Sequence, residues 1–252
     1  MSFKYLLLAV FTLLVFNCKQ PKAYLSKIEG TQIKISDSLN TDSQIEAFIK
    51  PYREHIKKDL DSVLAYSKET YSKTDGNFNT ALGNFMADAV FDEANPIFNS
   101  RTGKNIDMVL LNHGGIRSII SKGNITTRTA YELMPFENSI VVVALKGTQI
   151  ASLVNYLSKV KTAHPISKLK LVLNKSFDVL ESSINGDNID ADKIYYVATN
   201  DYLYNGGDDM DFFKPNEGFF ALNYKIRNAL IDNFKKIDTI NPVRDDRFIQ
   251  IK

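Results

Sequence analysis

The segment Asn112-His113-Gly114-Gly115-Ile116-Arg117 directly follows an apolar run over residues 106–111. Such a run, ending in a glycine pair, is typical of a buried strand that leads into a sharp turn. The glycines allow tight bending of the backbone, and the guanidinium of Arg117 offers a planar fork of donors. This strand end is predicted to contact phosphate or carboxylate oxygens of a ligand. The alternative is a structural Arg117 that ties down a loop carbonyl.

A second glycine pair, in Asn205-Gly206-Gly207-Asp208, follows another apolar run, and Tyr202 stands shortly before it. The segment Pro135-Phe136-Glu137-Asn138 adds a second aromatic residue. Aromatic rings, an Arg, an Asp and bare backbone together suit an aromatic base and its sugar or phosphate. A binding site is therefore expected, although the chain has 16 Phe and 12 Tyr residues and a core position is the ordinary place for each.

Apolar periodicity predicts the elements around these segments. The predicted helices cover residues 43–61, 80–95, a stretch after Gly147, and 223–235, with Pro96 just beyond the end of the second. The predicted strands cover residues 27–35, 106–111, 138–146, 169–173, 177–184 and 194–199, with a hairpin turn at Asn185-Gly186. Short strands and a hairpin argue against a purely parallel sheet, so the expected fold is a single α+β domain with mixed sheets and flanking helices.

Length and charge limit the classes of protein to consider. A chain of 252 residues can bury a full core, and we expect a domain over residues 43–252 preceded by a tether over residues 19–42. Its 31 basic and 29 acidic side chains give a net charge of +2, which creates no strong field. A nucleic-acid polymer is therefore not an expected partner.

Residues 1–18 have a different character. Lys4 precedes an apolar run over residues 5–16, which is short for a bilayer span and fits the hydrophobic region of a secretory signal peptide. Residues 15–18 resemble a bacterial lipobox, and Cys18, the only cysteine, would carry the lipid. We expect secretion across the inner membrane and lipid anchoring in the bacterial cell envelope, in the periplasm or at the cell surface. A plain signal peptide or a short anchor helix with an incidental Cys18 is the alternative.

Five segments resemble, in order and spacing, motifs of the C-terminal, substrate-binding domain of the 5′-nucleotidase/UDP-sugar hydrolase family. They are residues 82–89, 112–117, 123–126, 135–138 and 202–208, and the resemblance runs from about Ala81 to Phe213. It implies the α+β fold of that domain, and recognition of a nucleotide or nucleoside in nucleotide catabolism.

The resemblance also implies roles for individual residues. In the family, aromatic residues at the positions of Phe136 and Tyr202 sandwich the base, and Asn138 and Asp208 stand where base and ribose are contacted. A turn-stabilising role is the alternative for Asn138 and Asp208, and loop packing is favoured for His113. The implied set is substrate-binding and contains no catalytic residue: Asn84, Asn112, Gly114, Gly115, Arg117, Phe136, Asn138, Tyr202, Gly206, Gly207 and Asp208.

Complete family members also carry a metallophosphatase domain that holds two metal ions. Such a site needs several His, Asp and Asn ligands, whereas this sequence has three histidines, His55, His113 and His164, and none forms a ligand pair. We expect no metal site or cofactor in this chain, and a separately encoded metallophosphatase that supplies divalent metals. Whether the chain acts as a hydrolase stays open. The alternatives are a non-catalytic nucleotide-binding surface lipoprotein and a scaffold that keeps only the fold.

One departure from the family pattern concerns the pocket itself. Lys168 stands where the family has a glycine that passes close to the ligand. Lys168 is therefore expected either to block the pocket or to add a positive charge to it. Asp88, in the first family segment, is expected to support the fold.

Overall fold

A computed structural model describes residues 3–4, 24–36 and 38–251. The chain divides into two units, Met1–Ile49 and Lys50–Lys252. Cys18 and the predicted signal peptide, apart from residues 3 and 4, lie outside the described residues, as does part of the predicted tether. In the described part of the chain, none of the helices has both the length and the apolar character needed to cross a membrane.

The helices of the described residues have lengths from one turn to six. They are α2 (Ser43–Leu60), α3 (Ala81–Thr102), α4 (Thr127–Leu133), α5 (Gly147–Val160), α6 (Asp201–Tyr204) and α7 (Ile226–Lys236). Single 3₁₀ turns cover η1 (His113–Gly115), η2 (Gly207–Asp209) and η3 (Asp211–Phe213).

The strands form three mixed sheets. The sheet orders are β11-β1-β3, β10-β4-β9-β2-β5 and β12-β6-β7-β8. The strands are β1 (Val63–Ser67), β2 (Met108–Leu110), β3 (Gly123–Thr126), β4 (Ser139–Lys146), β5 (Ile166–Ser167), β6 (Leu169–Leu173), β7 (Val179–Ile184), β8 (Asp187–Asn188), β9 (Ile194–Asn200), β10 (Gly218–Lys225), β11 (Thr239–Ile240) and β12 (Phe248–Gln250).

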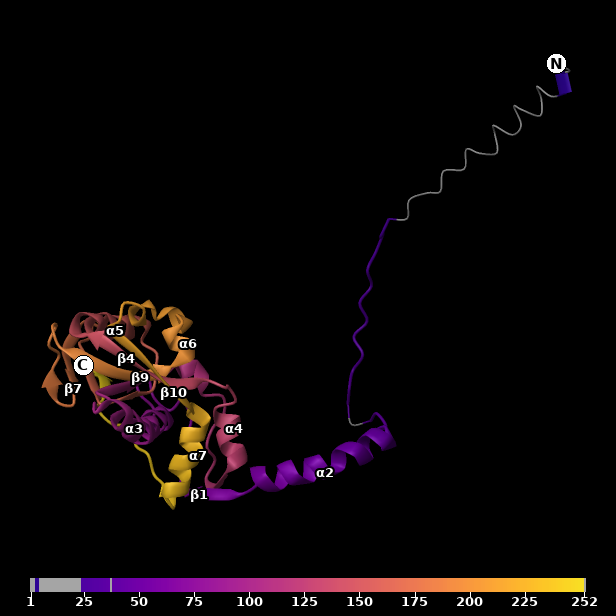
Figure 1. The fold of residues 1–252 in the computed structure, drawn as a ribbon, viewed down its shortest axis with the longest axis horizontal. Helices are drawn as coiled ribbons and strands as arrows, with labels where there is room; N and C mark the ends of the chain where they lie inside the picture. The colour runs from indigo at the N-terminus through magenta and orange to yellow at the C-terminus, as the bar shows by residue number, and fades with distance from the viewer. Residues whose placement is uncertain (1–2, 5–23, 37, 252) are drawn as a thin grey trace. The chain divides into compact units, whose positions relative to one another are not determined.

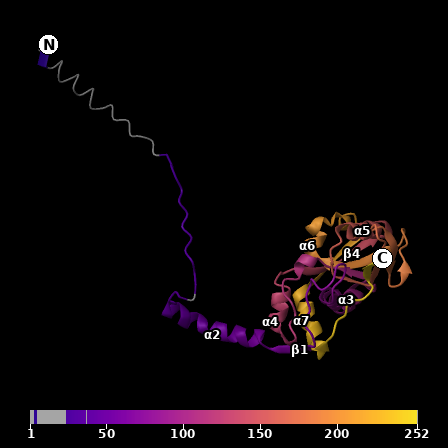
Figure 2. The same cartoon turned by 180° about the vertical axis from the view of Figure 1, so that it is seen from behind.

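The five-stranded sheet separates two apolar cores; Figures 1 and 2 show the ribbon from opposite sides. Because successive side chains of a strand point to opposite faces, β4 sends Ile140 and Val142 into one core and Val141 and Val143 into the other. Helices α3 and α7 cover the first face. Helix α5 covers the second.

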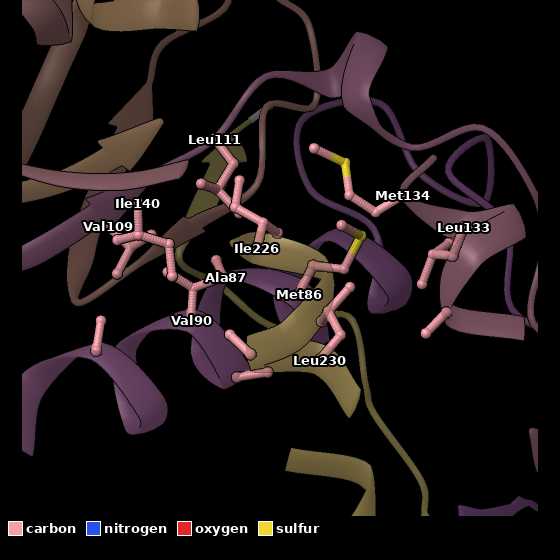
Figure 3. Close-up of a cluster of buried hydrophobic side chains, with 14 of the residues drawn as sticks. Met86, Ala87, Val90, Val109, Leu111, Leu133, Met134, Ile140, Ile226 and Leu230 are labelled. Atoms are coloured by element: carbon pink, nitrogen blue, oxygen red, sulfur yellow. The ribbon is translucent and has the colours of Figure 1, made fainter. Parts of the chain in front are cut away.

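Figure 3 shows the first core, where α3 and α7 pack on the sheet. Met86 and Val90 of α3 meet Ile226 and Leu230 of α7, and all four are at most 2% exposed. Full burial of one such side chain contributes roughly 1.5–3 kcal/mol. This packing fixes the start of α7 beside the segment that leads into β4.

The order of strand ends positions the candidate site. Strands β2 and β9 are parallel neighbours, so their carboxyl ends lie at the same edge of the sheet. Strand β4 is antiparallel to β9 with Ile140 opposite Asn200, so the beginning of β4 lies at that edge too. Three loops therefore converge there: residues 112–117, 135–138 and 201–208.

Most predicted elements are confirmed, and the fold is α+β. Helix α2 begins as predicted, with Asp42 Oδ1 accepting from the amides of Gln44 and Ile45 at 2.8 and 3.1 Å. Asn185 and Gly186 have φ values of 53° and 87°, which fit the predicted hairpin turn between β7 and β8.

Three predictions about elements were wrong. Helix α3 continues past Pro96 to Thr102, where Gly103, with a φ of 71°, ends it; the buried Phe98 holds this extension against the sheet. Residues 27–35 form no strand and are exposed. Residues 218–225 form β10, so the last helix begins at Ile226 and not at residue 223. Strand β10 is half exposed and bulged near Asn223, which hides its periodicity.

Candidate functional site

Asn200, the last residue of β9, holds the loop that follows β2. Asn200 Nδ2 donates to Asn112 Oδ1 at 2.8 Å, and Asn200 Oδ1 accepts from the amide of Leu203 at 2.8 Å. Asn112 is 9% exposed. One buried asparagine of β9 thus fixes both the start of the glycine loop and the start of α6.

A buried histidine lies behind the same loop. His164 Nδ1 lies 3.2 Å from the amide nitrogen of His113 and 3.3 Å from the carbonyl oxygen of Leu111. Burial lowers the pKa of His164 to about 4, so its ring is neutral at neutral pH. The Nδ1 of His113 lies 3.1 Å from the carbonyl oxygen of Ala163. These contacts agree with the loop-packing role favoured for His113.

Arg117 and Phe136 come from neighbouring loops. The Cζ of Arg117 lies 5.8 Å from the centroid of the Phe136 ring, and its Nη1 lies 3.5 Å from the carbonyl oxygen of Gly114. Phe136 is 42% exposed. The guanidinium is therefore near an exposed aromatic face and only weakly held by the protein.

Tyr202 and Asp208 are joined within the third loop. The hydroxyl of Tyr202 donates to Asp208 Oδ1 at 2.9 Å, and that hydrogen bond raises the pKa of Tyr202. The hydroxyl of Tyr156 donates to the carbonyl oxygen of Asp208 at 2.6 Å. Asp208 has a φ of 52°, an uncommon value for a residue other than glycine. Tyr156 thus holds the backbone of Asp208, and Tyr202 holds its side chain.

The second glycine pair makes room for the Tyr202 ring. A Cβ atom on Gly207 would lie 2.4 Å from Cε1 of Tyr202, which is closer than carbon atoms approach. Gly206 has a φ of 95°, in the region that favours glycine. Tyr202 nevertheless stays 46% exposed.

These three loops line one cavity of about 290 Å³, which we term the aromatic pocket. Its lining residues are Asn112, Gly114, Arg117, Phe136, Asn138, Tyr202 and Asp208. All seven belong to the predicted substrate-binding set. Gly115, Gly206 and Gly207 lie in the turns that support the lining.

Asn84 lies elsewhere. Its Nδ2 donates to Asn79 Oδ1 at 3.0 Å and to the carbonyl oxygen of Val243 at 3.1 Å, and the residue lines a different cavity. The structure therefore places it in a network that ties α3 to the C-terminal segment. Asn84 does not line the aromatic pocket.

Lys168 does not line the aromatic pocket either. It therefore neither blocks that pocket nor adds a positive charge to its lining. Its Nζ is 4.8 Å from the centroid of the Phe91 ring, in a cavity beside α3. Asp88 supports the fold as expected, because it accepts from Ser167 Oγ at 2.6 Å and from two Arg247 nitrogens at 2.9 Å each.

The donor set of the described residues does not fit a metal centre. Within residues 3–4, 24–36 and 38–251, no group of three or more His, Cys, Asp or Glu side chains is placed to hold a metal ion. The acidic side chains of the 208–211 loop therefore do not form such a group.

Sequence comparisons identify related proteins. The model of the family described as 5′-nucleotidase, C-terminal domain, matches residues 58–215. The trifunctional nucleotide phosphoesterase protein YfkN of Bacillus subtilis is 33% identical over 187 residues, which are 68% of this chain and 12% of that protein. The cell wall protein Lmo0130 of Listeria monocytogenes is 31% identical over 148 residues, which are 53% of this chain and 18% of that protein.

A solved structure shares the fold. The 5′-nucleotidase precursor of Thermus thermophilus superposes with a TM-score of 0.68 at 23% identity, over 82% of this chain and 43% of that one. The chain thus spans less than half the length of these similar proteins. It belongs to the 5′-nucleotidase C-terminal domain family.

Proposed function

We propose that the aromatic pocket binds the base of a nucleotide or nucleoside between Phe136 and Tyr202. The observation that carries this proposal is that two rings from separate loops, 42% and 46% exposed, line the same cavity. A base stacked on an aromatic ring gains roughly 1–3 kcal/mol, largely independent of which base it is.

Polar groups around the two rings suit the rest of the ligand. Asn138 can donate to and accept from a base edge, and the Asp208 carboxylate keeps acceptor capacity for ribose hydroxyls beyond its bond from Tyr202. The Arg117 guanidinium, near the Phe136 ring, suits a phosphate. Asn112 and the Gly114-Gly115 backbone would form the wall beneath the sugar.

In this proposal the chain is the recognition half of a phosphoesterase. A metallophosphatase in a separate chain would hold the divalent metals, which clamp the attacking and leaving oxygens of the displaced phosphate. The pocket would hold the nucleotide in a fixed orientation for hydrolysis of its phosphate ester or anhydride. Support comes from the similar B. subtilis protein, which is named a trifunctional nucleotide phosphoesterase and of which this chain matches 12%.

Calorimetry with adenosine and uridine tests base recognition. Phe136→Ala and Tyr202→Ala should each weaken binding by roughly 1–3 kcal/mol. Phe219→Ala is the matched control, because Phe219 is 44% exposed and does not line the pocket. Absence of binding to the wild type, or unchanged affinity in both pocket variants, would contradict the proposal.

Hydrolysis assays test whether recognition and catalysis lie in separate chains. The purified chain alone should not turn over AMP or UDP-glucose with added manganese, cobalt or zinc, and the metallophosphatase encoded beside it should gain activity or change its substrate preference in its presence. Steady metal-dependent turnover by the purified chain would refute a separate catalytic chain. Nucleoside binding without any effect on the metallophosphatase would favour the non-catalytic surface protein.

We also propose that Cys18 carries a lipid that anchors the domain in the cell envelope. The cell wall relative from L. monocytogenes supports an envelope location. Cys18→Ser should abolish incorporation of a fatty-acid analogue, since the sequence contains a single cysteine. Equal incorporation in both forms would show that residues 1–18 act as an ordinary signal peptide or anchor.

A further inference from the structure

Arg227 lies at the start of α7 and reaches back to the loop that carries Phe136. Its Nη1 lies 3.4, 3.2 and 3.3 Å from the carbonyl oxygens of Met134, Pro135 and Phe136. The residue is 4% exposed. It stands outside residues 58–215, so the family motifs do not include it.

The second arm of the guanidinium holds the next residue of the loop. Arg227 Nη2 donates to the carboxylate of Glu137, which also pairs with Lys225. Hydrogen bonds from Lys225 and Arg227 lower the pKa of Glu137 to about 2, so its carboxylate is charged at neutral pH. The Cζ of Arg227 also lies 4.1 Å from the centroid of the Tyr131 ring.

Backbone hydrogen bonds hold the two ends of the segment between α4 and β4: the Met134 amide donates to the Ala130 carbonyl at 3.0 Å, and the Ile226 amide donates to the Asn138 carbonyl at 3.1 Å. Between these ends, the Arg227 cation contacts three successive carbonyls and a carboxylate. A buried cation is weak support for stability because its desolvation opposes its attractions. Its concentrated contacts with a single loop point instead to control of that loop's conformation.

We propose that Arg227 is a positioning residue for base recognition: it holds residues 134–137 so that the Phe136 ring faces the aromatic pocket. Arg227 does not line the pocket and acts through Phe136. The binding consequence rests on the proposed function, whereas the conformational consequence does not.

Arg227→Met tests the proposal, with Arg247→Met as the matched control. Both arginines are largely buried and hold several partners, but those of Arg247 are Asp88, Asp245 and the Ile166 carbonyl, away from the aromatic pocket. Arg227→Met should weaken adenosine binding about 5- to 30-fold, because about one residue's backbone freedom must then be lost on binding. Arg247→Met should change the affinity by less than about twofold.

A double-mutant cycle separates positioning from general destabilisation. In a Phe136→Ala background, Arg227→Met should cause no further loss of affinity, since the residue through which Arg227 acts is gone. An equal loss in both backgrounds, or equal losses from Arg227→Met and Arg247→Met, would overturn the proposal. If Arg227→Met does not fold, Arg227→Lys keeps the charge but not the fork and should give an intermediate loss; wild-type affinity in Arg227→Lys would overturn the proposal as well.

Fluorine NMR gives a readout that does not depend on nucleoside binding. With fluorinated phenylalanine incorporated, the Phe136 signal is identified by its absence in Phe136→Leu. Arg227→Met, or Arg227→Lys, should shift or broaden that signal, and Arg247→Met should leave it unchanged. If the wild type binds no nucleoside, the proposed function fails, and an unchanged Phe136 signal in the folded Arg227 variant would then refute the positioning role by itself.

Discussion

The aromatic pocket and the cavity beside α3 differ in how strongly their polar groups are bound to other groups of the protein. The cavity beside α3, which we term the charged cavity, has a volume of about 510 Å³ against about 290 Å³ for the aromatic pocket. In its wall, Arg247 donates to Asp88 and Asp245, and Lys170 pairs with Glu181 and Asp246. These charged groups of the larger cavity are paired within the protein.

The aromatic pocket has the opposite character. Arg117 makes one long contact of 3.5 Å with a backbone carbonyl, and both rings are more than 40% exposed. Groups that the fold does not use are the ones that a ligand can use. The difference between the two cavities indicates that recognition capacity, and not volume, marks the candidate site.

The largest expected effect is on the free energy of unfolding, which should fall in a variant of the charged cavity and stay nearly unchanged in a variant of the aromatic pocket. Arg247→Met should lower the free energy of unfolding by about 2–4 kcal/mol, since it leaves two partly exposed carboxylates without their cation. Arg117→Met should change it by less than about 0.5 kcal/mol. Urea denaturation measures both.

Binding should show the reverse order. Arg117→Met should weaken AMP more than adenosine, because only AMP carries a phosphate, while Arg247→Met should affect neither. A strong stability loss in Arg117→Met, or a selective loss of AMP binding in Arg247→Met, would remove the distinction between the cavities.

The buried His164, which lies behind the glycine loop of the aromatic pocket, should make the free energy of unfolding depend on pH. The pKa of His164 is lowered from 6.5 to about 4 by burial, so the unfolded chain binds more protons between these values. The stabilising contribution is present above pH 6.5 and is lost as pH falls towards 4. The loss is on the order of 3 kcal/mol.

A comparison of His164→Asn with His55→Gln isolates this contribution. His164→Asn should flatten the pH dependence of the urea midpoint between pH 6.5 and 4. The exposed His55 on α2 should not matter. If the urea midpoint of His164→Asn depended on pH as steeply as that of the wild type, the surroundings of His164 would be more open to water than its contacts indicate.

A smaller effect should distinguish two glycines of the pocket loops. Gly207→Ala should displace the Tyr202 ring and weaken adenosine binding by about 1–3 kcal/mol, as loss of one stacking face would. A Cβ atom on Gly114 would meet its nearest atom at 3.7 Å, so Gly114→Ala should fold with wild-type stability. Calorimetry and thermal denaturation of the pair provide the check, and full affinity in Gly207→Ala would argue against stacking on Tyr202.

The predictable part of the fold is the part with strong periodicity. The apolar residues of α5 recur at helical spacing, the strands β4, β6 and β9 are rich in apolar residues, and the structure follows these patterns closely. Strand β10 escaped prediction because it is a half-exposed edge strand with a bulge, and an edge strand does not need an apolar repeat. Pro96 was a misleading stop signal, since tertiary packing of Phe98 outweighs it.

The sequence predicted which loop residues form the candidate site, but not the contacts that hold them in place. Motif positions indicated Phe136, Tyr202 and Asp208, and the antiparallel pairing of β4 with β9, with Ile140 opposite Asn200, explains why they meet. Asn84 was placed in the same set by motif alone, and Lys168 was expected either to block the pocket or to add a charge to it; the contacts of both side chains lie outside the lining of the aromatic pocket. Arg227 carries no sequence signal, because its role depends on carbonyls about 90 positions earlier in the chain.

The structure of the adenosine complex tests the central claim most directly. The account predicts the adenine ring between the rings of Phe136 and Tyr202, with the ribose hydroxyls within hydrogen-bond distance of Asp208. Adenosine bound in the charged cavity, or bound with Phe136 and Tyr202 both still exposed to solvent, would contradict it.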